Sequence, residues 1–411
     1  MSVSLEDVRA WDAADPLRGF RDRFVLPEGV IYLDGNSLGA LPAAIGERVA
    51  AAVATEWGEG LIRSWNTHDW IGAPARVGAK IARLIGAAPR EVVVADSTSV
   101  NLFKLIVAAV RGQAGRRVIL AEPGNFPTDL YIAQGAAALL DGASLRVLPI
   151  GPLTEAFDDD VALVMLTHVH YKSGAKHDMA AITRRAHEAG ALVLWDLSHS
   201  AGAVEVDLNA AGVDLAVGCG YKYLNGGPGA PAFLYVAERH QATLQSPLTG
   251  WMGHAAPFAF GDDYRPAEGV DRFLCGTPSI LAMLALEVGV EQFDGADMPS
   301  VSAKAQRLCS LFIDLVETRC VNLGLTLVTP RDSSGRGSHV AFAHEDAYAI
   351  MQALIERGVI GDFRAPDILR CGFTPLYVGF EDVWRAVETL RDVLVTDAWR
   401  ATRFQTRSRV T

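Results

Sequence analysis

The chain has 411 residues, of which 50% are hydrophobic and 21% are charged, and its formal net charge is −11 at pH 7. This length and apolar content suffice for a large buried core plus a smaller second domain, and they exclude an intrinsically disordered chain. The negative charge argues against nucleic acid or an anionic membrane as a partner, so positive potential at a ligand site has to be local.

The start of the chain carries no targeting or membrane signal. Residues 1–7 lack the basic start and apolar stretch of a signal peptide. No apolar run approaches the roughly 18 residues that span a bilayer. The five cysteines are odd in number and scattered, which gives neither a disulfide framework nor zinc spacing. We therefore expect a cytoplasmic protein.

In chain order, hydrophobic periodicity predicts alternating helices and strands over the first 290 residues. Helices are expected near 48–57, 72–85, 100–110 and 179–189. Strands are expected at 91–95, 117–120, 144–148, 161–166, 191–195 and 215–217. Such alternation predicts an α/β fold with a mostly parallel sheet covered by helices on both faces.

Past about Gly289 the pattern changes to a smaller α+β arrangement. Helices are expected at 301–318, 345–357 and 380–395, with strands at 325–329 and 339–342. The basic, polar stretch 400–411 is expected to fray. The resulting division is a segment 1–45 that packs with the small domain, a large cofactor-binding domain 46–289 and a small domain 290–411.

The most informative pair of residues is Lys222 and Asp196. Lys222 lies between two tyrosines and is followed by a glycine-rich turn, while Asp196 ends the apolar run 191–195, which is typical of a buried parallel strand. A lysine for a Schiff base and an acid for a pyridinium nitrogen are what pyridoxal phosphate (PLP) requires of a protein. A surface lysine and a helix-capping aspartate are the alternative; the two together, in this order, favour the cofactor.

Other candidates gather where strands end, as expected for ligands of open α/β sheets. Ser97 and Thr98 follow a strand and open a helix, where a phosphate or an ordinary helix cap fits. Phe126 could stack on a pyridine ring or belong to the core. Tyr221 could act as a general acid. His199 could orient the carboxylate of Asp196, or be purely structural.

Three histidines invite a metal interpretation that we do not favour. His168 and His170 share a side if the preceding strand continues, and His177 follows. No third ligand stands at a supporting spacing, so hydrogen-bonded core histidines are the better hypothesis, and no metal is expected.

Eight segments carry a resemblance to a known family: Leu33–Gly39, Ser64–Asn66, Ala95–Lys104, Asn125–Tyr131, Asp196–Gly202, Tyr221–Asn225, Gly250–His254 and Arg272–Pro278. The sequence resembles the kynureninase family, bacterial type, whose members are PLP-dependent enzymes of fold type I in the aminotransferase superfamily. The resemblance runs from about residue 33 to 390.

Residue by residue, the resemblance implies Lys222 as the Schiff-base lysine, Asp196 as partner of the pyridinium nitrogen and Tyr221 as a proton donor. It implies a homodimer with shared active sites, in which Trp251 and Thr277 cross from the other subunit. For the substrate, it implies Arg370 as the grip on an α-carboxylate, with Trp65 and Ser37 nearby. The implied cofactor contacts are Ser97, Thr98, Phe126, Asp129, Thr167, Asp196, His199, Tyr221, Lys222, Trp251 and Thr277.

The activity that the resemblance implies is hydrolysis of L-kynurenine to anthranilate and L-alanine, in tryptophan catabolism by the kynurenine pathway. Gly276 and Thr277, with Trp65, resemble the branch that prefers kynurenine, so 3-hydroxykynurenine would be the poorer substrate. The alternative is another fold type I enzyme such as a cysteine desulfurase-like lyase, for which Cys371 would be the candidate cysteine, or a PLP-binding protein without catalysis. An NAD-binding protein is disfavoured because no Gly-x-Gly-x-x-Gly follows the first strand.

Overall fold

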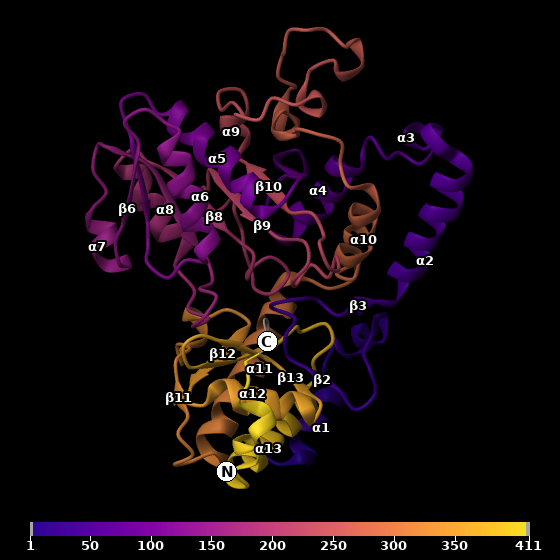
Figure 1. Cartoon of the computed structure of the whole chain (residues 1–411), viewed down its shortest axis with the longest axis vertical. Coiled ribbons are helices and arrows are strands. Elements are labelled where there is room, and N and C mark those ends of the chain that lie inside the picture. The colour runs from indigo at the N-terminus through magenta and orange to yellow at the C-terminus, as the bar shows by residue number, and fades with distance from the viewer. Residues whose placement is uncertain (1–2, 408–411) are drawn as a thin grey trace.

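The computed structural model describes residues 3–407, apart from the side chains of Pro152 and Thr154. Figure 1 shows a large body built on a seven-stranded sheet and, below it, a smaller body built on a four-stranded sheet. Among the described residues, no helix is long and apolar enough to cross a membrane.

The large sheet has the strand order β4-β10-β9-β8-β7-β5-β6, and only β10 runs antiparallel to its neighbours. The prediction of a mostly parallel sheet is therefore confirmed. Sequence analysis did not identify β10. The strands are β4 (Val92–Val94), β5 (Val118–Ala121), β6 (Ser144–Val147), β7 (Val161–Thr167), β8 (Leu192–Asp196), β9 (Leu215–Gly218) and β10 (Phe233–Val236).

Both faces of this sheet are buried, because successive side chains of a strand point to opposite sides. Val92 and Val94 belong to one core cluster, which includes residues of α4 and α8. Val93, between them, belongs to a second cluster with α5 and α6. The helices of the large body are α4 (Ala73–Leu84), α5 (Thr98–Gly112), α6 (Pro127–Ala138), α7 (Ile150–Glu155), α8 (Met179–Glu188), α9 (Glu238–Gln241) and α10 (Ile280–Glu291).

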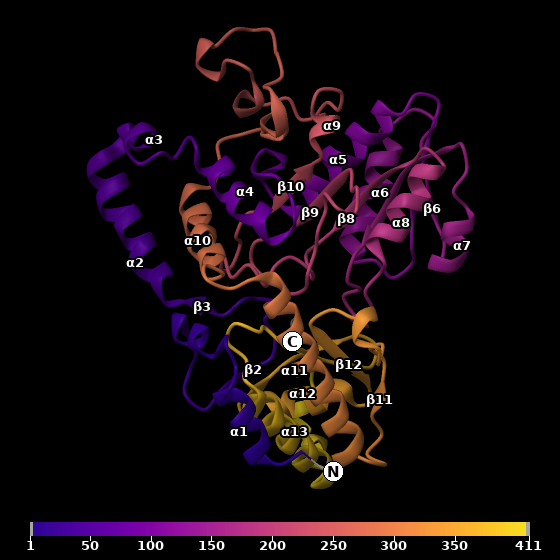
Figure 2. The ribbon, with the colours of Figure 1, turned by 180° about the vertical axis from the view of Figure 1, so that it is seen from behind.

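An extended arm projects from this body. It comprises α2 (Ala43–Ala51), a π-helical continuation over Ala52–Gly60, a 3-10 turn and α3 (Ser64–Thr67). In Figures 1 and 2 the arm stands apart from the sheet, with α3 at its far end. The helix predicted over 48–57 is thus present, although its second half has the wider π-helical winding.

The smaller body packs helices against an antiparallel sheet of order β11-β12-β15-β14. The predicted helices and both predicted strands in this region are confirmed, whereas β13, β14 and β15 were not identified. Its elements are α11 (Met298–Arg319), β11 (Thr326–Leu327), β12 (His339–Ala343), α12 (Ala347–Glu356), β13 (Val359–Ile360), β14 (Asp362–Arg364), β15 (Ile368–Gly372) and α13 (Phe380–Val395).

The N-terminal segment packs on this smaller body. The carboxylate of Asp12, from α1 (Leu5–Ala13), accepts hydrogen bonds from the backbone N–H groups of Phe380 and Glu381 at 2.7 and 2.8 Å, capping α13. Strand β2 (Ile31–Tyr32) pairs with β13, and β1 (Phe24–Val25) pairs with β3 (Leu41–Pro42).

The expectation of a frayed end from residue 400 is wrong for the part of the tail that the structure describes. Phe404 is buried, and Arg403 forms an ion pair with Glu356. Phe404 stands among basic residues in the sequence, but its buried ring holds this segment on α12. Residues 408–411 of the predicted tail lie outside the described residues.

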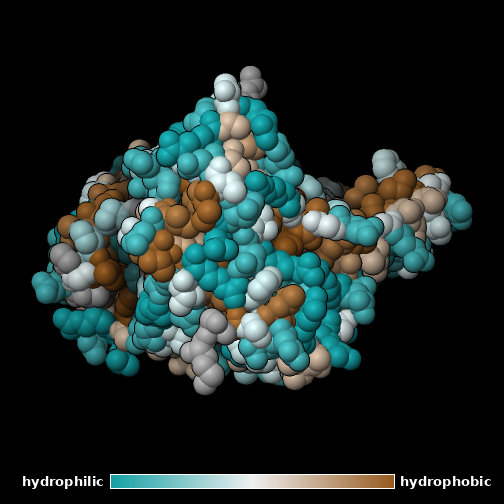
Figure 3. All heavy atoms as spheres, turned by 90° about the horizontal axis from the view of Figure 1, so that it is seen from below, coloured by the Kyte–Doolittle hydropathy of each residue, from teal (hydrophilic) through white to brown (hydrophobic). Residues whose placement is uncertain are grey.

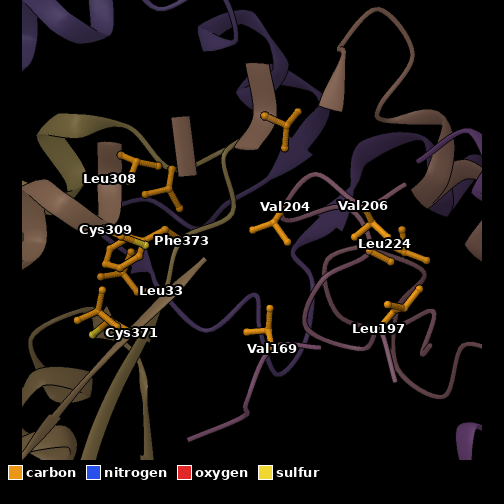
Figure 4. Close-up of a cluster of buried hydrophobic side chains, with 14 of the residues drawn as sticks. Leu33, Val169, Leu197, Val204, Val206, Leu224, Leu308, Cys309, Cys371 and Phe373 are labelled. Carbon is orange, nitrogen blue, oxygen red and sulfur yellow. The ribbon is translucent and has the colours of Figure 1, made fainter. Parts of the chain in front are cut away.

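A continuous apolar cluster joins the two bodies. Figure 4 shows Leu33 and Phe373, from the smaller body's side, together with Val169, Leu197 and Leu224. The last three follow β7, β8 and β9 respectively. The carboxyl edge of the large sheet therefore faces the smaller body, and residues from both can meet there.

Candidate active site

Thr167, Asp196 and Asp129 lie together at the carboxyl edge of the large sheet, which faces the smaller body. Thr167 and Asp196 end neighbouring strands and are paired in register. The hydroxyl of Thr167 donates to Asp129 Oδ2, on α6, at 3.3 Å. Burial, and then the charge of Asp196, raise the pKa of Asp129 well above its ordinary value. The neutral form of the Asp129 carboxyl is therefore favoured beside Asp196, the residue predicted to face a ring nitrogen.

Lys222 lies beside this pair, in the loop after β9. Its Nζ atom is 3.0 Å from Nε2 of His199 and 5.7 Å from the centroid of the Phe126 ring. The Phe126 side chain is 42% exposed, so one face remains free to stack on a planar ligand. His199 and Phe126, which were predicted separately from the sequence, therefore both lie beside the amine of Lys222.

The turn at 35–39 holds the lysine segment in place. The N–H of Gly39 donates to the carbonyl of Tyr221 at 2.8 Å. A Cβ atom at position 39 would lie 2.4 Å from the carbonyl oxygen of Lys222, so only glycine permits this approach. The glycine turn therefore positions the lysine segment.

A cavity of about 370 Å³ opens next to Tyr221. Ser97 and Thr277 both line it. The Ser97 hydroxyl caps α5 by accepting from the N–H of Val100 at 3.3 Å, and Thr98 begins the helix. The cap alternative for Ser97 is thus true, and because Ser97 also lines the cavity, the cavity adjoins the start of α5, a place where anions bind in many proteins.

Arg370, on β15, is buried on the opposite side of the junction. Its Nε donates to Asp362 Oδ1 at 2.8 Å, and its Nη2 donates to Ser37 Oγ at 3.0 Å. Arg364 joins the cluster, with Nη2 2.6 Å from Asp362 Oδ2. Burial opposes ionisation of Asp362, but the charges of Arg370 and Arg364 outweigh it and hold its pKa below the ordinary value. One carboxylate between two arginines leaves a net positive charge, suited to a carboxylate ligand.

Sequence analysis missed Asp362, Arg364 and Asp34 in this cluster. Asp34 precedes the glycine turn, and its pKa is raised to about 7, by burial first and by Asp362 second. One sequence feature could have identified the residues at 362–364. An acid and an arginine alternate there, two residues before a proline, and such charged residues are unusual in a buried strand.

Two predicted residues do not reach Lys222 within the chain. Trp65 lies on α3, at the far end of the arm, where its ring packs edge-on against Trp70 at 5.9 Å. Trp251 begins the 3-10 turn Trp251–Gly253, with its ring against Phe258 at 5.7 Å.

The histidines considered for a metal have other partners. His168 is 2.9 Å from the hydroxyl of Ser200, and His177 Nε2 is 2.6 Å from Glu122. Within residues 3–407, no group of three or more His, Cys, Asp or Glu side chains is arranged to hold a metal ion.

Comparison with solved structures identifies the class. A C-DES mutant with glycine covalently linked to its PLP cofactor matches with a TM-score of 0.77 and 19% identity, covering 90% of this chain and 99% of that chain. A cysteine desulfurase from Escherichia coli matches with a TM-score of 0.77 and 20% identity, covering 92% and 98%. The fold is that of the fold type I PLP-dependent enzymes.

Sequence relatives specify the family. Residues 301–390 match the family described as "Kynureninase C-terminal domain". A kynureninase of Burkholderia mallei is 55% identical over 412 residues, covering 99% of each chain. A kynureninase of Pseudomonas fluorescens is 53% identical over 411 residues, covering 98% of this chain and 99% of its own. The chain belongs to the kynureninase family.

Proposed function

We propose that this protein is a PLP-dependent hydrolase that converts L-kynurenine to anthranilate and L-alanine. The observation that carries the proposal is the position of Lys222, between the Phe126 ring and His199, at the sheet edge that also holds Asp196. Full-length identity of 53–55% to kynureninases supports the choice of reaction over others of the same fold.

The residues present fit PLP. Lys222 would bind the cofactor covalently, Phe126 would stack on its ring, and Asp196, backed by Asp129 and Thr167, would pair with its ring nitrogen. Ser97 and Thr98, at the start of α5, would hold its phosphate with Tyr221 and Thr277. When bound, PLP supplies an electron sink for the pair released at the substrate α-carbon.

The protein's own groups would then perform binding and proton transfer. Arg370, with Ser37 beside it, would bind the substrate α-carboxylate and orient the amino acid. The amine of Lys222 would remove and return the α-proton at Nζ. After water attacks the γ-carbonyl and the Cβ–Cγ bond breaks, the phenol of Tyr221 would donate a proton to the three-carbon fragment. Burial raises the pKa of Tyr221, so the donor stays protonated.

We further propose a homodimer with shared sites in the cytoplasm. Val53, Trp57, Leu61 and Ile62 expose large apolar side chains along the arm. Figure 3 shows such residues gathered on the projecting arm. A second copy covering this surface would bury it and bring Trp65 and Trp251 to an active site that they do not reach in their own chain.

The division into an N-terminal segment 1–45, a large domain 46–289 and a small domain 290–411 is part of this proposal. It places Lys222 and Asp196 on the large domain and Arg370 on the small one. The two groups would then approach or separate as the domains move.

A cysteine desulfurase-like activity has less support. Cys371, the candidate nucleophile, is buried within β15, and burial raises the pKa of its thiol. A desulfurase requires an accessible, mobile thiolate. The likeness to a cysteine desulfurase structure, at 20% identity, concerns the fold alone.

The test is an absorbance scan of the purified protein with PLP, followed by addition of L-kynurenine and then of 3-hydroxykynurenine. We expect a visible cofactor band, anthranilate fluorescence and a higher kcat/KM for kynurenine. A band without anthranilate would overturn the reaction but keep the cofactor. A higher kcat/KM for 3-hydroxykynurenine would overturn the substrate preference.

A further inference from the structure

A buried lysine lies directly behind the cavity proposed for the phosphate. Lys104 is on α5, and its side chain has no exposed surface. A lysine in the protein interior requires a charged or strongly polar partner to offset its desolvation. Its ammonium has two acceptors in the structure, the carboxylate of Asp96 and the carbonyl of Phe273, the latter at 2.6 Å.

One of these acceptors, Asp96, lines the cavity, and the other, Phe273, directly precedes a segment that lines it. Asp96 lines the cavity and immediately precedes Ser97. Phe273 ends a 3-10 turn and is followed by the segment 274–279, which also lines the cavity and carries Thr277. The ammonium of Lys104 therefore bonds to two segments, at Asp96 and at Phe273, that are about 180 positions apart in the sequence.

The wall that contains Asp96 has an unusual backbone. Asp96 has φ +47°, a left-handed conformation that non-glycine residues rarely adopt. Its carbonyl accepts from the N–H of Ala232 at 2.9 Å, and its carboxylate accepts from Lys104. The turn between β4 and α5 is thus held from both sides, which sets the direction of Ser97 and of the first N–H groups of α5.

The charge of Asp96 needs compensation at this place. Its side chain is 33% exposed and lines the space where a phosphate dianion would sit. An unpaired carboxylate there would repel the phosphate, whereas the Lys104 ammonium cancels its charge. The chain as a whole carries −11, so it supplies no general attraction for an anion.

We propose that Lys104 is a positioning residue for phosphate binding: it fixes the two segments at Asp96 and Phe273 and neutralises Asp96. The inference rests on the proposed function, because it assumes that the cavity holds the phosphate of PLP. Lys104 acts through Asp96 and Phe273 and does not touch the ligand itself. It holds the segment carrying Thr277 whether that residue serves its own chain or a second copy.

The test compares the binding of PLP with that of pyridoxal, which lacks the phosphate, to the cofactor-free protein, followed by absorbance and tryptophan fluorescence. For Lys104→Met we expect the dissociation constant of PLP to rise about 10-fold or more, and that of pyridoxal to change less than about 2-fold. In Lys104→Met/Asp96→Asn, removal of the unpaired charge is expected to restore part of the PLP affinity. Equal losses for both ligands would overturn the proposal.

Lys304→Met is the matched control. Lys304 is also a buried lysine, with Nζ 2.6 Å from Asp15, but it lies in the smaller body. Its loss is expected to lower the thermal stability without changing the preference for PLP over pyridoxal. If it changes that preference as much as Lys104→Met does, the effect is general destabilisation and the proposal fails.

Asp96→Asn alone covers the case in which Lys104→Met does not fold. The amide oxygen can still accept from Lys104, so the turn is retained while a negative charge is removed. We expect inorganic phosphate to compete with PLP at about 3-fold or more lower concentration than in the parent protein. Weaker competition would overturn the proposal. If the parent protein itself binds neither PLP nor pyridoxal, the proposed function fails instead.

Discussion

The Nζ atom of Lys222 lies 3.0 Å from Nε2 of His199. Burial, and then the charge of Lys222, hold the pKa of His199 well below its ordinary value. The ring is therefore neutral near pH 7 and can accept a hydrogen bond from the amine. Among the described residues, its Nδ1 atom is buried without a hydrogen-bond partner. The amine is thus directed by one neutral contact and remains free to react with a carbonyl group.

Replacing this amine is expected to abolish turnover. Lys222→Ala removes the group proposed to bind the cofactor and to move the α-proton, so anthranilate formation should fall by about 10³-fold or more. The measurement is anthranilate fluorescence at saturating PLP, with circular dichroism to verify folding. Lys176→Ala is the control and should retain parental activity. Substantial turnover by Lys222→Ala would remove Lys222 from the mechanism.

Tyr221→Phe is expected to lower kcat about 100-fold, because the proposed proton donor is lost. Burial, followed by Cys219 and Asp196, raises the pKa of the phenol, so it does not deprotonate in the active pH range. The kcat–pH profile of the variant should therefore keep the shape of the parent profile at a lower level. A variant that loses only the alkaline limb would show instead that Tyr221 titrates in the parent enzyme.

Asp34 should make the stability depend on pH. Its pKa is raised from 3.8 to about 7 in the folded protein, by burial first and by Asp362 second. The unfolded chain therefore loses this proton at lower pH than the folded chain, and its contribution to stability is lost as the pH rises from about 4 to 7.

Asp34→Asn removes this titration. Relative to the parent, the variant should gain stability across that pH window, by at most about 4 kcal/mol, and should gain nothing further above it. Urea unfolding at a series of pH values measures the difference. A stability difference that is constant with pH would contradict the raised pKa.

Arg370→Lys is expected to raise KM for the amino-acid substrate about 10- to 100-fold, with a smaller effect on kcat. Lysine keeps the charge but cannot form the planar two-point contact with a carboxylate. Steady-state kinetics with L-kynurenine measures both constants. Arg336→Lys is the control, since Arg336 is equally buried but bonds to Gln306 and Ser310; it should alter stability and leave KM unchanged. An unchanged KM in Arg370→Lys would contradict the proposal that Arg370 binds the substrate α-carboxylate.

The apolar arm offers a test of the homodimer. Ile62 is 77% exposed, and a charge at this position would be buried in the proposed interface. Ile62→Glu should shift the protein from dimer to monomer in sedimentation velocity and reduce activity with it. Leu139→Glu is the control, because Leu139 is 70% exposed on the large body away from the arm. A monomeric parent, or a dimer unaffected by Ile62→Glu, would contradict this interface.

Sequence reasoning identified the strands β4 to β9 and the helices α4, α5 and α8 of the large body, because these segments are continuous apolar runs or strongly periodic. It did not identify the helices α6, α7, α9 and α10. It also did not identify the strands β10, β14 and β15; the last two contain Asp362, Arg364 and Arg370, which interrupt the apolar pattern of a buried strand. The prediction for the tail was wrong because Phe404 lies among basic residues, which suggested a solvated segment. In the folded protein Phe404 is buried and Arg403 pairs with Glu356 of α12, and neither contact is visible in the local sequence.

The chain by itself determined the reactive pair, since Lys222 and Asp196 each follow a recognisable strand and strand ends of a parallel sheet meet at one edge. Tertiary structure alone decided which residues surround them. Gly39 approaches the backbone of Lys222, Asp362 pairs with Arg370, and Lys104 joins Asp96 to Phe273. These contacts depend on how two bodies and distant loops pack, and local periodicity carries no information about such long-range approach.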